Sequence, residues 1–201
     1  MLPAMPAWAF ATMIAGGIWL CLWTSKPRLF GIVPIALGAV GAAASPTPDL
    51  LVTGDGRHMA LVDERGIPLL LRERSGDYIR DVMAEAAGFD EDPQALAAHP
   101  FTSCSRDTCV TTIVRDGRSW RLLATRSSTS VDWLPLIRAC AEADIVVSDR
   151  WLPRHCNPRW LKLDRRTLGQ TGGLSIFLAP EAGVVTVAER VGAHPWADSR
   201  W

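Results

Sequence analysis

Two uncharged apolar runs near the N-terminus constrain this chain more than any other feature of its sequence. Residues 4–23 and 29–45 contain no Asp, Glu, Lys or Arg, and Lys26 and Arg28 are the only charged residues between them. A helix needs about 20 apolar residues, within a range of roughly 17 to 25, to cross a bilayer. The sequence therefore predicts a transmembrane helical hairpin over residues 1–48, with spans at about 4–24 and 29–45, and a soluble domain over residues 49–201.

The charges around the spans predict the side of the membrane on which the domain lies. Basic loop residues favour the cytoplasm, and the next basic residue after Lys26 and Arg28 is Arg57. If the short loop is cytoplasmic, both the N-terminus and the domain lie outside. We therefore expect a protein of the inner (plasma) membrane whose domain is periplasmic.

Small residues recur along the first run at Ala7, Ala11 and Ala15. Two interpretations stay open, because an Ala-rich span has this spacing by composition alone, whereas small residues also let transmembrane helices approach closely. Under the second interpretation the partners are the membrane and other transmembrane helices of a channel bundle, and a second copy of the chain is a further candidate.

Beyond Pro48, short apolar runs alternate with turn residues, which is typical of a sheet protein with a few helices. The class is α/β or α+β with layered sheets. Residues 89–100 are acidic and turn-rich and are expected to form an exposed loop. The helix at 131–143 is expected to place Trp133, Leu136, Ile137 and Cys140 on one side. The expected strands are 50–52, 58–62, 68–71, 110–114, 119–124, a buried strand within 143–149, 174–178 and 184–188, and the other expected helix is 76–87.

Four cysteines in the domain, Cys104, Cys109, Cys140 and Cys156, fit either two disulfides in an oxidising compartment or one metal site in a reducing one. If the domain is periplasmic, two local disulfides are the simpler explanation, Cys104 with Cys109 and Cys140 with Cys156.

The charge of the domain is divided along the chain. Residues 49–100 carry 11 acidic and 5 basic residues, whereas residues 101–170 carry 12 basic and 7 acidic residues. A charged run is either a solvated face or a patch that attracts phosphates. Trp151 and Trp160 interrupt the densest basic run and are either core anchors or platforms for unstacked bases. The candidate DNA-binding residues are Arg150, Arg154, Arg159, Lys162, Arg165 and Arg166.

Four residues are weak candidates for catalysis. Asp55 and His58 lie close together in a predicted tight turn, for which an ordinary β-turn is the simpler explanation. Asp149 directly precedes the basic run, and His155 lies within it. No C-x2-C pair, G-x-S-x-G or Walker A motif occurs. The sequence therefore assigns no catalytic residue, and it predicts no metal and no cofactor.

Several segments in order resemble the C-terminal part of the ComEC family of competence proteins, the DNA-uptake channels of natural transformation. The matching segments are GGIWLCLW, RLFGIVPIALGAVGAA, PDLLVTGDGRHMALV, ADIVVSDRWLPRHC and TGGLSIFL. The resemblance implies a periplasmic domain of metallo-β-lactamase-like αββα type. The nuclease-like members of this family have a His-x-His-x-Asp-His element and a later His pair. Here no two of the four histidines are close enough for the element, and Arg150-Trp151 stands where the pair would be.

The departure from the family pattern implies a degenerate domain that binds or guides DNA without metal-dependent cleavage. Two alternatives stay open. One is a metal-dependent hydrolase or nuclease that uses Asp55, His58, Asp149 and His155, and the other is a purely structural periplasmic domain of a membrane assembly.

Overall fold

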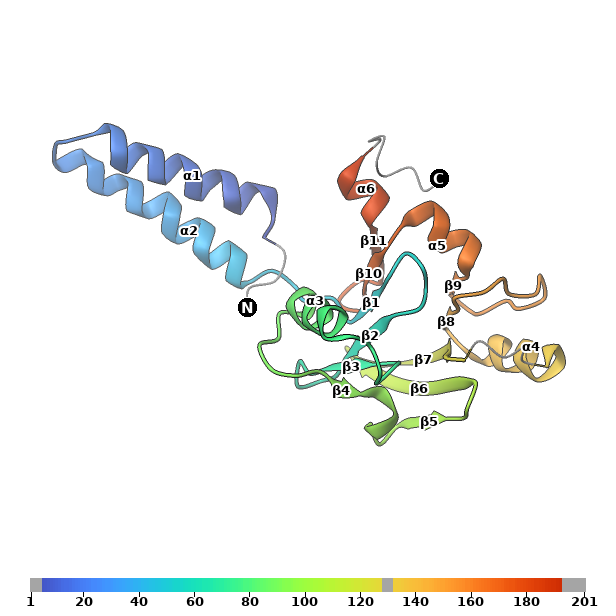
Figure 1. The fold of residues 1–201 in the computed structure, drawn as a ribbon. Helices are drawn as coiled ribbons and strands as arrows, with labels where there is room; N and C mark the ends of the chain where they lie inside the picture. The colour runs from blue at the N-terminus through green and yellow to red at the C-terminus, as the bar shows by residue number, and fades with distance from the viewer. Residues whose placement is uncertain (1–4, 128–131, 193–201) are drawn as a thin grey trace. The chain divides into compact units, whose positions relative to one another are not determined.

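The computed structural model describes residues 5–127 and 132–192 (Figure 1). The chain divides into two compact units, Met1–Thr47 and Pro48–Trp201. The N-terminal unit contains helix α1 (Ala7–Leu22), the 3-10 helix η1 (Lys26–Gly31) and helix α2 (Ile32–Ala43). Small residues allow α1 and α2 to pack closely, since a Cβ on Gly38 would lie 2.6 Å from the Ala9 carbonyl oxygen. Ala7, Ala11 and Ala15 are exposed.

One helical segment of this unit, Lys26–Ala43, is long and apolar enough to cross a membrane, with 18 residues and a mean hydropathy of 1.2. This criterion rests on length and composition alone. Only 17% of the segment is buried, unlike the core helix of a soluble protein. Helix α1 has 16 residues and falls short of the length criterion, so the structure supports one of the two predicted spans.

The C-terminal unit is a mixed α/β domain with two sheets. The first sheet has the strand order β11-β10-β1-β2-β3-β4 and is antiparallel except for the β3–β4 pair, and the second has the order β5-β6-β7-β8-β9, with β7, β8 and β9 parallel. The strands of the first sheet are β1 (Leu50–Val52), β2 (Met59–Val62), β3 (Pro68–Leu70), β4 (Gln94–Ala95), β10 (Leu174–Phe177) and β11 (Gly183–Thr186). Those of the second are β5 (Thr102–Cys104), β6 (Thr108–Arg115), β7 (Arg118–Thr125), β8 (Ile145–Val147) and β9 (Leu161–Leu163). The helices are α3 (Asp77–Ala87), η2 (Leu96–Ala98), α4 (Trp133–Glu142), α5 (Arg165–Thr171) and α6 (Val187–Val191).

Alternation along the strands builds four layers, helix, sheet, sheet and helix. Leu50 and Val52 enter the core between the two sheets, whereas Leu51 points outward to a second cluster with Met83 of α3. In the second sheet, Val146 points outward to a third cluster with α4. Figure 1 shows α3 against β1–β3 and α4 beside the ends of β7 and β8. The strands β1, β2, β3 and β8 read as continuous apolar runs because both of their faces are covered.

An ion pair joins the two sheets. Arg115, the last residue of β6, donates from Nε to the carboxylate of Asp49 and from Nη2 to the Val62 carbonyl. The second oxygen of Asp49 accepts the backbone N–H of Leu178 at 2.7 Å. Both charged side chains are only 14% exposed. This contact ties the start of β1 and the end of β10 to the end of β6 in the second sheet.

Three expectations about local structure are wrong. The predicted strand 184–188 ends at Thr186, because Val187 and Ala188 belong to α6. Residues 89–100 are not simply an exposed loop, because Gln94 and Ala95 pair in parallel with β3 and Leu96 is 1% exposed in the core. Trp133 does not share the buried side of α4 with Leu136 and Cys140, because it is 67% exposed. Trp133 is the first residue of α4.

Candidate functional site

The two segments that carry the candidate acidic residues lie side by side. The β1–β2 turn passes so close to the end of β8 that a Cβ on Gly56 would lie 2.9 Å from the Ser148 carbonyl oxygen and 3.1 Å from the Asp149 Cα. Gly56 also has a φ of 67°, which glycine adopts without strain. The strands β7, β8 and β9 are parallel, so their carboxyl ends meet at this same edge of the second sheet. We call the carboxyl ends of β7–β9 and the residues that follow them the strand-end edge.

Asp149 is held between two guanidinium groups. Arg72, which follows β3, donates from Nη2 to Asp149 Oδ2 at 2.9 Å, and Arg150 Nε lies 3.5 Å from Oδ1. The Asp149 side chain is only 13% exposed. The two cations neutralise the carboxylate and leave it poorly suited to bind a divalent cation.

His58 is linked to the same edge through a serine. Its Nδ1 lies 3.2 Å from Ser75 Oγ, and that hydroxyl donates to the Arg72 carbonyl at 2.8 Å. The imidazole therefore lies in a polar chain that leads through residues 72–75 to Asp149, without contacting the carboxylate directly.

Asp55 is an exposed turn residue whose carboxylate caps its own turn. It accepts hydrogen bonds from the Thr53 hydroxyl and, at 3.0 Å, from the backbone N–H of Arg57. Partial burial raises the pKa of the Asp55 carboxyl, but these hydrogen bonds and the charges of His58 and Arg57 outweigh that effect and hold the pKa below its usual value. This geometry is that of a turn-forming Asp.

The four candidate acidic and histidine residues do not form one centre. His155 is exposed in the loop after β8, while His58 contacts Ser75. Over residues 5–127 and 132–192, no three His, Cys, Asp or Glu side chains come together as a metal site would require.

Part of the predicted basic run lies at the strand-end edge. The Arg165 N–H donates to the Arg150 carbonyl at 3.1 Å, and Lys162 Nζ donates to the Pro153 carbonyl at 2.8 Å, so residues distant in sequence are neighbours here. Arg159 is further back along the sheet, where Nη1 lies 3.9 Å from buried Asp144. The side chains of Arg154, Arg165 and Arg166 are exposed.

The two tryptophans of the basic run have opposite roles. Trp160 packs against the fully buried Trp120, with ring centroids 5.0 Å apart, and belongs to the core. Trp151 is 67% exposed and lines a recess of about 90 Å³. Trp133 lies on the rim of the same recess, which the periodicity of its helix did not predict.

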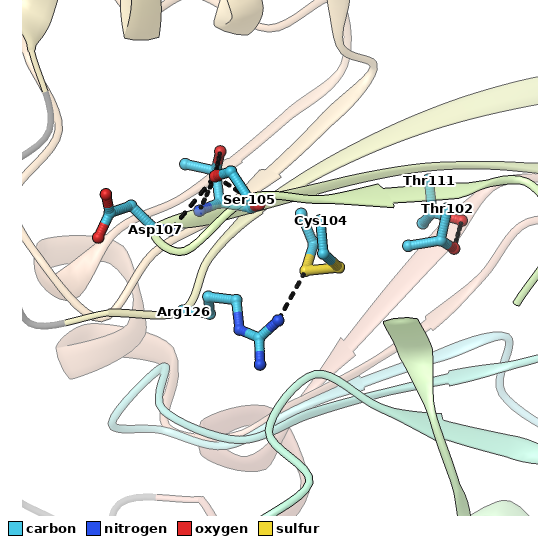
Figure 2. Close-up of a disulfide and its surroundings, with 8 residues drawn as sticks. Thr102, Cys104, Ser105, Asp107, Thr111 and Arg126 are labelled. Atoms are coloured by element: carbon cyan, nitrogen blue, oxygen red, sulfur yellow. Dashed lines mark hydrogen bonds between the residues drawn. A yellow bond between two sulfur atoms is a disulfide. The ribbon is translucent and has the colours of Figure 1, made fainter. Parts of the chain in front are cut away.

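Two disulfides stabilise the loops at this end of the domain. Cys140 of α4 is bonded to Cys156, which fastens the loop after β8 onto the helix, and Cys104 is bonded to Cys109 across the β5–β6 turn. These are the pairs expected from the sequence. Figure 2 shows the Arg126 guanidinium directed at the Cys104–Cys109 disulfide, with Nη1 4.0 Å from Cys109 Sγ.

A line of hydrogen bonds connects the β5–β6 turn to the strand-end edge. The Arg126 N–H donates to the Asp107 carbonyl at 2.9 Å, and Ser127 Oγ donates to the Asp107 carboxylate. Arg150 Nη2 in turn donates to the Ser127 carbonyl. These contacts hold the end of β7 and Arg150 in a defined position, and they continue the network that begins at His58.

Comparison of the chain with family models, with curated proteins and with solved structures finds no significant match to any of them.

Proposed function

We propose that this chain is a membrane-anchored part of a ComEC-like DNA-uptake system, in which residues 49–201 form a periplasmic metallo-β-lactamase-like domain. The domain binds or guides DNA and does not cleave it with a metal. The hairpin contributes two spans to a larger bundle of transmembrane helices. The proposal begins from the resemblance of five segments to that family.

The arrangement of the resembling segments supports the proposal. The order of layers, helix, sheet, sheet and helix, is the αββα order that the resemblance implies. The segments VTGDG and ADIVVSD approach each other where Gly56 contacts Ser148 and Asp149. In a metal-dependent nuclease this edge would hold the metal ligands. Here Arg72 and Arg150 neutralise Asp149, which supports a domain without a catalytic metal.

The observation that carries the DNA-binding part is the set of exposed guanidinium groups at the strand-end edge. Arg154, Arg165 and Arg166 are exposed beside the Arg150 backbone and the loop after β8. Guanidinium groups bind phosphate oxygens in two-point contacts and release condensed counterions from DNA. The expected ligand is therefore the phosphate backbone, bound without base specificity at these three residues.

The test is a charge reversal with a matched control. In the detergent-solubilised full chain, Arg154→Glu, Arg165→Glu and Arg166→Glu are combined, and the control combines Arg65→Glu, Arg118→Glu and Arg138→Glu, three exposed arginines outside the segments that meet at the strand-end edge. Each lost phosphate contact lowers the slope of log K against log salt by about 0.9 on duplex DNA. We expect a slope lower by about 2 to 3 for the first variant only. Equal DNA affinity of both variants and wild type would instead favour a structural role for the domain.

A further inference from the structure

The recess beside Trp151 combines features that one ligand class would match. Trp133 and Trp151, each 67% exposed, stand at its rim, and the aliphatic side chains of Leu136, Leu152 and Pro153 line its wall. Thr125 and Ser148 are 3% and 1% exposed and therefore form its floor, and Arg150 also lines the recess. The recess thus has flat apolar surfaces at its mouth and hydroxyl groups at its base.

Within residues 5–127 and 132–192, the hydrogen bonds at the floor leave one hydroxyl proton without an acceptor and therefore available to a ligand. Thr125 Oγ1 donates to Ser148 Oγ at 2.9 Å, and the Arg150 N–H also donates to Ser148 Oγ at 3.2 Å. The two hydroxyls carry two protons, of which their mutual bond uses one. The other is the Ser148 hydroxyl proton, which has no acceptor among the described residues. A buried donor of this kind is satisfied when a ligand presents a carbonyl oxygen.

We propose that this recess binds a single unstacked pyrimidine base of single-stranded DNA. A flipped-out base has two apolar faces for aromatic side chains and a polar edge that is read by hydrogen bonds. Trp133 and Trp151 stack on the base, and the Ser148–Thr125 pair donates to an edge carbonyl. The inference rests on the proposed function, because the basic residues of the strand-end edge bring the DNA strand to the recess.

The dimensions and shape of the recess select among possible occupants. Its small volume, about 90 Å³, favours one ring over the two fused rings of a purine. A lipid surface would cover the exposed tryptophans but would leave the hydroxyl floor unsatisfied. A pyrimidine satisfies both parts of the recess.

The position of the recess is set by the Cys140–Cys156 disulfide. Leu136 lies one helical turn from Cys140 on α4, and Leu152 and Pro153 lie just before Cys156. The bond therefore holds the two walls of the recess together. Because both sulfurs are buried, the walls are fixed before DNA arrives, which reduces the entropy that binding must overcome.

The test compares oligothymidylate, oligodeoxyadenylate and duplex DNA of equal length by fluorescence anisotropy, with the detergent-solubilised full chain. Trp151→Ala and Trp133→Ala remove the platforms, Trp151→Phe retains a stacking ring, and Phe101→Ala is the control at another aromatic residue, 72% exposed. We expect Trp151→Ala to lower the affinity for oligothymidylate about 5- to 100-fold with an unchanged salt slope, and Trp151→Phe to restore most of it. The preference of wild type for oligothymidylate over oligodeoxyadenylate should disappear in Trp151→Ala, and duplex binding should not change.

The outcomes separate the recess from the proposed function. If wild type binds DNA with a salt-dependent affinity but Trp151→Ala and Phe101→Ala both bind oligothymidylate as wild type does, the base-binding recess is wrong and the phosphate contacts stand. If wild type binds neither single-stranded nor duplex DNA at low salt, the proposed function itself fails.

Discussion

The two disulfides give the sharpest quantitative prediction, because they close loops of different length. Cys104 and Cys109 are 5 positions apart, whereas Cys140 and Cys156 are 16 apart. In the chain-entropy model, closing these loops lowers the entropy of the unfolded chain by amounts that correspond to about 2 and about 3 kcal/mol. The longer loop should therefore contribute more stability by about 1 kcal/mol.

Paired variants isolate each contribution. In the Cys104→Ala/Cys109→Ala variant, a reductant opens only the Cys140–Cys156 bond, and in the Cys140→Ala/Cys156→Ala variant it opens only the other. The difference between the free energies of unfolding with and without reductant then gives the contribution of each disulfide separately. Because the same variant is measured in both states, the packing change that alanine introduces cancels. Urea denaturation of the detergent-solubilised chain, followed by near-ultraviolet circular dichroism, measures both.

We expect reduction to cost about 3 kcal/mol in the first variant and about 2 kcal/mol in the second. Reduction of the Cys140–Cys156 bond should also weaken oligothymidylate binding, because this bond joins the walls of the recess. The reverse order of the two losses, or unchanged stability on opening Cys140–Cys156, would refute the reasoning from loop length.

Three further predictions concern stability and redox state. Arg115→Met leaves the Asp49 carboxylate unpaired between the sheets and should destabilise the domain by about 3 kcal/mol, with partial recovery when Asp49→Asn is added; no recovery in urea denaturation would contradict the ion-pair role. Partial burial raises the pKa of the Asp63 carboxyl, but hydrogen bonds from Ile67 and Arg65 outweigh this effect and hold the pKa below its usual value of about 4. The ionised Asp63 carboxylate therefore stabilises the folded domain above pH ~4, and this contribution is lost as the pH falls through the lowered pKa. The stability gap between wild type and Asp63→Asn should therefore close on acidification, and a gap that does not change with pH would argue against this cause. Mass mapping under non-reducing conditions should find the two disulfides and a free Cys21, whereas free thiols at the other four cysteines would contradict an oxidising compartment.

Local patterns predicted the elements that are specified by neighbouring residues. The strands 50–52, 58–62 and 68–71 correspond closely to β1, β2 and β3, because tight turns separate them. Helix α3 ends where predicted, since Gly88 adopts a φ of 76° and terminates it.

Features that depend on contacts distant in sequence were not predictable in this way. The burial of Leu96 follows from parallel pairing between β3 and β4. Trp151 and Trp160 share a basic sequence context, yet only Trp160 meets Trp120, a residue 40 positions earlier in the chain. The neutralisation of Asp149 likewise depends on Arg72, which lies 77 positions away.

The central claim is that the domain binds DNA through the strand-end edge without a catalytic metal. The most direct measurement is the binding of labelled single-stranded and duplex DNA to the full chain over a range of salt, with EDTA and with Mg²⁺, Mn²⁺ or Zn²⁺, together with analysis of the DNA recovered. We expect log K to fall linearly with log salt, EDTA to leave the affinity unchanged and the DNA to stay intact. No salt-dependent binding, or cleavage that requires a divalent metal and stops with EDTA, would contradict it.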